Sequence, residues 1–218
     1  MSSSTNPSSL LVQLRSVVPA RPLLYAEALR IAELQANRFL MLSGVTEPGT
    51  PSEVVTDLRF VQVSRRSDLP ASGYTDWYKP HWLIILSRSE PLVRQRFTLM
   101  HEFKHVLDHP FVAGLYPSTG TNTSEARAES VADHFAACVL MPKRFVKRLF
   151  GEGHQKVSEL ANIFGVSEVA MAYRLRQLGL TEPVARCSHA KTRPPVWRGY
   201  FRQAWRETPT GAVIGVLA

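Results

Sequence analysis

The spacing of apolar positions predicts a long helix near the start of the chain. From Arg21 to Leu42, apolar and small residues recur at helical intervals, and Gly44 and Pro48 end the pattern. The expected buried stripe consists of Leu24, Ala28, Ile31, Leu34 and Phe39. The polar, serine-rich residues 1–20 before it are expected to be disordered.

A different pattern follows, which indicates a small sheet of about three strands. The ranges 58–63 and 82–86 are short runs rich in branched and aromatic residues. Residues 72–77 (SGYTDW) lie between them, before the Lys79-Pro80 break. We expect 72–77 and 82–86 to form a hairpin, and 72–77 to be an edge strand.

Two longer segments are helical by pattern. In 94–107, Phe97, Met100, Phe103 and Leu107 share one side, whereas His101 and His105 lie only about 40° apart on another. In 125–141, the expected core stripe is Ala128, Val131, Ala132, Phe135, Cys138 and Val139. Asn122 or Ser124 is the expected N-cap, and Pro142 stops this helix.

The rest of the chain is basic, and its pattern is helical up to Leu180. A helical block begins at Lys143, and 157–180 is typical of two short helices around the turn at 165–167. Ala161 and Gly165 have the spacing of a helix-turn-helix, in which small residues let two helices cross closely. The second helix offers Met171, Tyr173, Arg174 and Arg176 but few base-reading amides, which favours packing or substrate docking over DNA reading.

Charge is distributed unevenly along the 218 residues. Residues 1–142 contain 13 Lys and Arg against 13 Asp and Glu, so the net charge of +8 arises entirely after Pro142. The tail from 184 to 207 also interleaves arginine with Trp197, Tyr200, Phe201 and Trp205. This basic third could contact nucleic acid or an acidic partner, or it could simply be a solvated surface.

The string HEFKH, from His101 to His105, carries the strongest chemical signal. Two histidines at i and i+4 on a helix can direct ring nitrogens to one metal ion, and zinc is the expected ion. Glu102 beside the first histidine can then act as the general base on a water molecule. The sequence therefore predicts a zinc-dependent peptidase with Glu102 as its catalytic residue.

A catalytic zinc site needs a third protein ligand. Position 108 is aspartate and position 111 is phenylalanine, which excludes the metzincin pattern. Glu129 is the favoured third ligand, with His109 and Asp108 as alternatives. Asp133, one helical turn after Glu129, could orient a ligand imidazole or be a solvated carboxylate.

The sequence does not select the group that would stabilise an oxyanion. His134, Tyr116 and His81 are candidates, although each could equally have a core or surface role.

RQRFTLMHEFKHVLDHP followed by ESVADHFAACVLMP resembles the ImmA/IrrE family of bacterial metallo-endopeptidases. The similarity continues through KVSELANIFGVSEVAMAYRLRQLGL and covers roughly residues 21–180. It implies an α+β, minimal zincin-like fold over 21–150 and a helix-turn-helix-like region at 151–180. The basic aromatic tail at 181–218 lies beyond the similarity. The resemblance also implies that His101, His105 and Glu129 hold the metal and that Glu102 is the base.

The resemblance further implies a substrate, namely a helix-turn-helix transcriptional repressor that controls a mobile element or a stress response. The alternative is a DNA-binding regulator with a structural or vestigial metal site. No apolar run approaches the roughly 20 residues of a membrane span, and only two cysteines are present. We therefore expect a cytoplasmic protein without a membrane partner.

Overall fold

The computed structural model describes residues 7–119, 122–181, 203–207 and 213–217. Its helices are α1 (Pro7–Arg15), α2 (Tyr25–Leu42), α3 (Glu53–Thr56), α4 (Leu92–Asp108), α5 (Val112–Leu115), α6 (Ser124–Leu140), α7 (Lys143–Gly151), α8 (Val157–Phe164) and α9 (Glu168–Gln177). Its strands are β1 (Val61–Arg66), β2 (Gly73–Tyr78), β3 (His81–Ser87), β4 (Gln203–Glu207) and β5 (Val213–Leu217). The α+β class expected from the sequence is confirmed.

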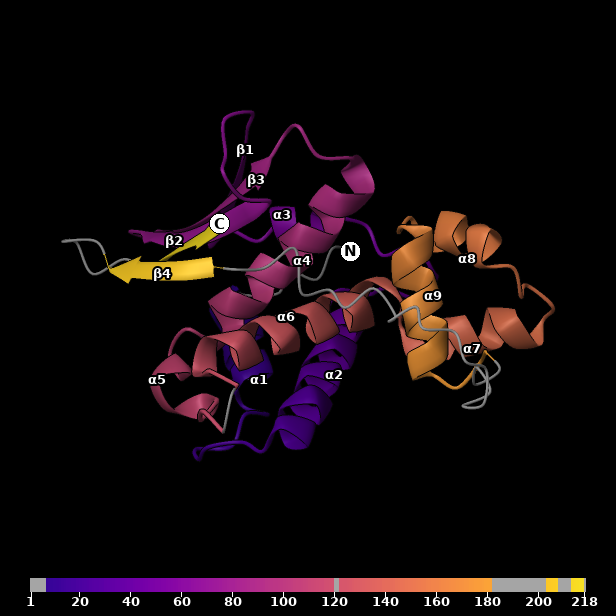
Figure 1. The fold of residues 1–218 in the computed structure, drawn as a ribbon, viewed down its shortest axis with the longest axis horizontal. Helices are drawn as coiled ribbons and strands as arrows, with labels where there is room; N and C mark the ends of the chain where they lie inside the picture. Colours follow the sequence, from indigo (N-terminus) through magenta and orange to yellow (C-terminus); the bar gives the residue numbers. More distant parts are fainter. Residues whose placement is uncertain (1–6, 120–121, 182–202, 208–212, 218) are drawn as a thin grey trace, which may run out of the picture.

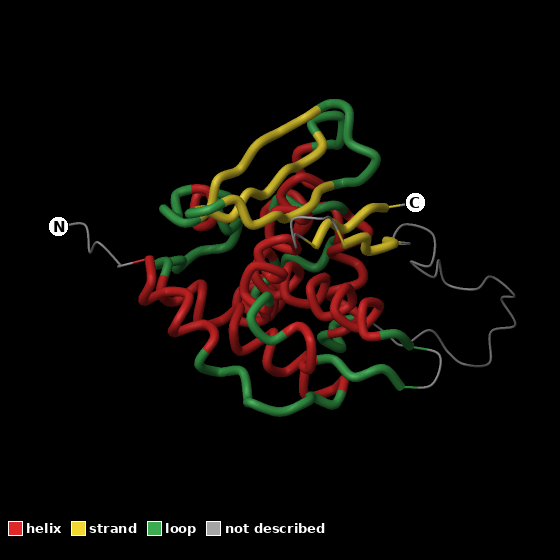
Figure 2. Tube along the Cα trace, turned by 90° about the vertical axis from the view of Figure 1, so that its left-hand side faces the viewer, coloured by secondary structure: helices red, strands yellow, loops and turns green. Residues whose placement is uncertain are grey.

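A three-stranded mixed sheet covers one side of the helices (Figure 2). The strand order is β1-β3-β2, with β1 parallel and β2 antiparallel to β3. The predicted hairpin of the last two strands is confirmed, and β2 is an edge strand. The first strand begins three residues later than expected, at Val61.

The helices α4 and α6 cross at the centre of the molecule, with α2 against α6 and α7 to α9 grouped at the end away from the sheet (Figure 1). The predicted stripe on α6 is buried throughout. Helix α6 is capped by Thr123, whose hydroxyl oxygen accepts a hydrogen bond from the Ala126 amide, and not by Asn122 or Ser124.

The buried face of α2 agrees only in part with the predicted stripe: Ala28 and Phe39 are buried and Ile31 packs against the core. Leu24 and Leu34 are exposed, whereas the buried side chains are Ala28, Ala32, Gln35, Ala36, Phe39 and Leu40. The reason is that α2 lies close to α6, and small alanine side chains allow two helix axes to approach. The predicted stripe was therefore wrong at Leu24 and Leu34, and it left out the small and polar residues Ala32, Gln35 and Ala36.

The expectation that residues 1–20 are disordered is wrong for 7–15, which form α1. Leu10 and Leu14 of this helix are buried in the core. Arg15 donates hydrogen bonds from Nε to the Leu107 carbonyl at 3.2 Å and from Nη2 to the Val106 carbonyl at 2.9 Å. These carbonyls belong to the last turn of α4, where a cation is favoured.

The short C-terminal strands β4 and β5 pair with each other, and β5 lies beside β2 (Figure 1). Trp205 is in β4, while Trp197, Tyr200 and Phe201 lie outside the described residues. Within the described part of the chain, no helix has the length and apolar character needed to span a membrane.

Candidate metal centre

Two ligand atoms come from consecutive turns of α4. His101 is buried and His105 is partly buried, and their Nε2 atoms lie 3.1 Å apart. Between them, Phe103 serves the fold: it is fully buried and packs against Phe39 and Phe135. The helical spacing thus separates a packing face from the face that presents the two imidazoles.

The third ligand atom comes from α6. Glu129 places Oε2 3.2 Å from His101 Nε2 and Oε1 3.3 Å from His105 Nε2. Both oxygens are buried, and neither accepts a well-formed hydrogen bond from any described residue. Two carboxylate oxygens in such surroundings are costly unless a cation receives them.

The spacing of these atoms fits a zinc ion. Zinc bonds of about 2.0–2.1 Å in a tetrahedral arrangement place neighbouring ligand atoms about 3.3–3.4 Å apart. The observed separations of 3.1, 3.2 and 3.3 Å are close to that value. Among the described residues, His101, His105 and Glu129 are the group of ligating side chains that could hold a metal ion.

Asp133 lies one turn after Glu129 on α6 and contacts the far side of His101. Its Oδ1 is 2.9 Å from His101 Nδ1. In the tautomer with its proton on Nδ1, His101 donates to this carboxylate and keeps the Nε2 lone pair for a metal ion. The structure therefore places Asp133 where the sequence suggested, behind a ligand histidine.

The charges around these ligands perturb their pKa values. Burial alone would lower the pKa of His101, but its hydrogen bond to Asp133, its close contact with Glu129 and the charges of both carboxylates raise that pKa well above the ordinary value. Burial would raise the pKa of Glu129, but the two histidines lower it strongly. The Glu129 carboxylate is therefore ionised, as a metal ligand must be.

Glu102 is not one of the three possible ligands, and a residue of the sheet binds its side chain. Its side chain is buried, and Oε2 accepts a hydrogen bond from the Thr75 hydroxyl of β2 at 2.8 Å. Glu102 directly follows His101 in the chain and is not one of the three residues that could hold a metal ion.

The two alternative third ligands have other partners. Asp108 is buried with Lys104 and Tyr116: it accepts hydrogen bonds from the Lys104 ammonium and, at 2.5 Å, from the Tyr116 hydroxyl. The His109 ring packs edge-on against Trp82, with ring centroids 4.7 Å apart. Neither belongs to the group that could hold the metal.

Two of the three oxyanion candidates contact other residues, and the third lies farther along the sheet than Thr75. Tyr116 is hydrogen-bonded to Asp108, and burial together with that carboxylate raises the pKa of its hydroxyl. His134 lies 3.6 Å from Cys138, and burial and the nearby Arg174 lower its pKa. His81 begins β3 opposite Tyr78, three register positions from Thr75 and hence about 10 Å along the strand.

Sequence reasoning missed Thr75. Strand alternation could have placed it on the same face as Gly73 and Trp77, but no motif connects it with Glu102, which is 27 residues later.

The helix-turn-helix-like region has the two predicted helices, α8 and α9, around Gly165. Two of the four side chains named for the would-be recognition helix are buried: Met171 is in the core, and Arg174 donates from Nε to the Met141 carbonyl at 3.1 Å. Tyr173 and Arg176 are exposed. Arg174 thus provides a hydrogen-bond donor for a main-chain carbonyl at the C-terminal end of α6, and it is not available to a ligand.

Comparison with known proteins agrees with this geometry. The model of the family described as IrrE N-terminal-like domain matches residues 61–176, which run from β1 into α9 and include every residue of the site. No functionally curated protein matches the chain significantly.

One solved structure with the same fold is a Mycobacterium tuberculosis transcriptional regulator. The TM-score is 0.55 and the sequence identity is 18%, over 76% of this chain and 51% of that one. This chain therefore spans about half the length of that regulator.

Proposed function

This chain belongs to the ImmA/IrrE metallopeptidase family, and from that premise we propose that it is a zinc-dependent endopeptidase that cleaves a helix-turn-helix transcriptional repressor. The observation that carries the proposal is the convergence of His101, His105 and Glu129, together with a buried residue, Glu102, that directly follows His101 in the chain and is not one of the ligands. A purely structural metal site has no need of such a carboxylate.

The chain supplies the proton transfers of the reaction. A zinc ion held by His101, His105 and Glu129 would polarise the scissile carbonyl group and make water more acidic. Glu102 takes a proton from the attacking water as its oxygen bonds to the carbonyl carbon. Glu102 then returns that proton to the amide nitrogen as the C–N bond breaks. The leaving group therefore departs as a neutral amine, and Glu102 is again a carboxylate.

Strand β2 offers an edge for an extended substrate. The Ser87 amide donates to the Ser72 carbonyl, which makes residues 72 and 87 a hydrogen-bonded pair. Because such pairs alternate in an antiparallel ladder, the main-chain groups of Gly73, Thr75 and Trp77 point away from β3. A substrate segment can pair with these groups in β-strand form.

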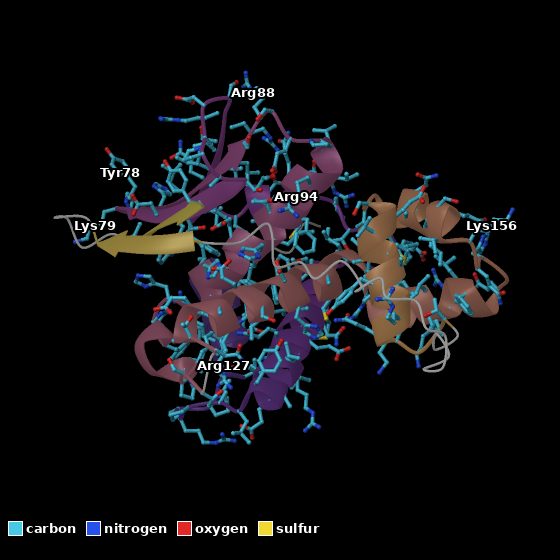
Figure 3. All side chains as sticks on the ribbon, viewed as in Figure 1. Tyr78, Lys79, Arg88, Arg94, Arg127 and Lys156 are labelled. Atoms are coloured by element: carbon cyan, nitrogen blue, oxygen red, sulfur yellow. The ribbon has the colours of Figure 1, made fainter. Side chains whose placement is uncertain are left out.

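The outer end of this edge carries exposed side chains. Tyr78 and Lys79 project from the hairpin, far from the helices (Figure 3). Strand β5 lies beside β2, although the sheet that contains β2 ends at that strand. A substrate segment must therefore share this space with residues 213–217.

Main-chain pairing has little side-chain selectivity, so recognition of a particular repressor needs a second surface. The excess positive charge after Pro142 is one source of contact, and α9 exposes Tyr173 and Arg176 there. We place the folded part of the repressor against this basic surface and its exposed linker along β2.

The second candidate function is DNA-binding regulation with a structural metal site. It is favoured by the fold shared with a transcriptional regulator and by the basic C-terminal third. It is disfavoured by the burial of Met171 and Arg174, which removes two of the four side chains named as possible DNA contacts of α9.

The proposal is tested by incubating the purified zinc-loaded protein with a cognate repressor and measuring fragment masses. We expect cleavage at one site, little activity on casein, and at least about a 100-fold loss of rate in Glu102→Gln with zinc retained. An intact repressor, together with retarded migration of operator DNA by this protein alone, would establish the regulator instead.

A further inference from the structure

We propose that Thr75 is a positioning residue that orients the Glu102 carboxylate for proton transfer, an inference that rests on the peptidase function proposed above. Thr75 is neither a ligand nor part of the HEFKH motif. It acts on the reaction through Glu102.

The contact is short and well directed. Thr75 Oγ1 donates to Glu102 Oε2 at 2.8 Å and lies 3.3 Å from the main-chain oxygen of the same residue. Glu102 is only 5% exposed, so water cannot readily replace this donor. The hydrogen bond selects one orientation of a carboxylate that would otherwise rotate about its terminal torsion.

The fold brings Thr75 to this place through a close approach of β2 to α4. A Cβ atom at Gly73 would lie 2.7 Å from Thr98 Cγ2, so only glycine fits there. Two residues along the strand advance about 6.7 Å, and four residues along the helix advance about 6 Å. The strand and the helix therefore advance by nearly equal distances between the two contacts. Because Gly73 lies against Thr98, Thr75 lies against Glu102.

The main chain of Thr75 has a second role at the edge of β2 that faces away from β3. Its amide and carbonyl are among the groups of β2 that point away from β3. A substrate strand that pairs there is aligned by the same residue whose hydroxyl holds the base. Thr75 thereby fixes the base relative to the scissile bond, and such placement affects turnover more than binding.

The test compares Thr75→Val, which keeps the branched shape but removes the hydroxyl, with Thr75→Ser, which keeps the hydroxyl. We expect Thr75→Val to lower kcat on the repressor by about 10- to 100-fold, as for loss of one hydrogen bond to a charged group, with KM nearly unchanged. Thr75→Ser should recover most of that rate. Thr56→Val, on α3, is the matched control because the Thr56 hydroxyl donates to its neighbour Asp57.

Two readouts separate positioning from a structural role. Zinc content should be the same in all variants, and the dissociation constant for the repressor should match between Glu102→Gln and the double variant Thr75→Val/Glu102→Gln. The valine substitution should also cause no further loss of rate once Glu102 has been replaced.

Normal kcat in Thr75→Val, with Glu102→Gln inactive, would overturn the positioning role and leave the peptidase function standing. Loss of zinc in Thr75→Val, a serine variant as slow as the valine variant, or additive losses in the double variant would also overturn it. Wild-type protein that cleaves no repressor would overturn the peptidase function itself, and with it this inference.

Discussion

Glu129 and Asp133 lie on a different helix from the two histidines that they contact. On α4, the spacing of His101 and His105 alone was enough to predict a shared ligand face. On α6, two carboxylates one turn apart beside an apolar stripe indicated a cation, and the structure shows their separate positions: Glu129 between both Nε2 atoms and Asp133 at Nδ1 of His101.

Replacing Glu129 tests the ligand set. Glu129→Ala should lower zinc affinity by more than the roughly 10- to 100-fold typical of losing an outer partner of a ligand. His109→Ala should keep about one zinc per chain, because its ring packs against Trp82 and not against the ligand atoms. Metal content after dialysis, measured by atomic emission, decides between them, and the reverse pattern would show that His109 is the third ligand.

Other residues could not have been assigned from the sequence. Lys104 occupies a variable position of HEFKH, yet it is fully buried, where Asp108 and Tyr116 receive its ammonium group. Burial lowers the pKa of Lys104, and the charge of Asp108 partly offsets this. The pattern of one helix does not reveal such a cluster, because Tyr116 reaches it from beyond α5.

Among the elements, those defined by their own periodicity were predicted well. The boundaries of α4 and α6 agree with expectation to within about two residues, as is usual for strongly periodic helices. Helix α1 was missed because its polar, serine-rich surroundings indicate disorder, while its stability comes from contacts that Leu10, Leu14 and Arg15 make with distant parts of the chain.

Because β2 lies close to α4, adding one methyl group at Gly73 should destabilise the protein. In Gly73→Ala, the new Cβ would meet Thr98 Cγ2 at 2.7 Å and the Ile85 carbonyl oxygen at 2.8 Å. Because the second of these is main chain and cannot easily move, we expect a loss of about 1–3 kcal/mol in the free energy of unfolding. Urea denaturation measures it.

Gly151→Ala is the matched control for this substitution. No atom lies within 4 Å of the position that the new methyl group would take, and Gly151 ends helix α7, so the change should be neutral or stabilising by up to about 1 kcal/mol. Equal stability of both variants would show that β2 does not approach α4 as closely as described.

Across the whole molecule, the helix-turn-helix-like region and the metal-binding helices share one core. Leu160, Phe164, Met171 and Leu175 belong to the same buried cluster as the core residues of α4 and α6. Arg96 of α4 adds polar connections, since its guanidinium donates to the Gly165 and Thr50 carbonyls. Such tertiary contacts between distant segments were beyond the sequence patterns, which located α8 and α9 but not their packing.

This arrangement predicts that the metal site tolerates loss of the C-terminal segment. A chain ending at residue 181 retains α4, α6 and the buried cluster described above. We expect it to bind about one zinc per chain and to unfold cooperatively. Metal analysis and calorimetry check this, and a metal-free or non-cooperative product would show that residues 182–218 support the site.

The two unsatisfied oxygens of Glu129 have a consequence for the amount of protein in a cell. An ion that binds only the folded chain increases folding stability by mass action, by about 2.7 kcal/mol when its free concentration is about 100 times Kd. Chains without zinc would unfold more often, and unfolded chains are removed by cellular proteases. Scarcity of zinc would therefore reduce both the activity of each molecule and the number of molecules present.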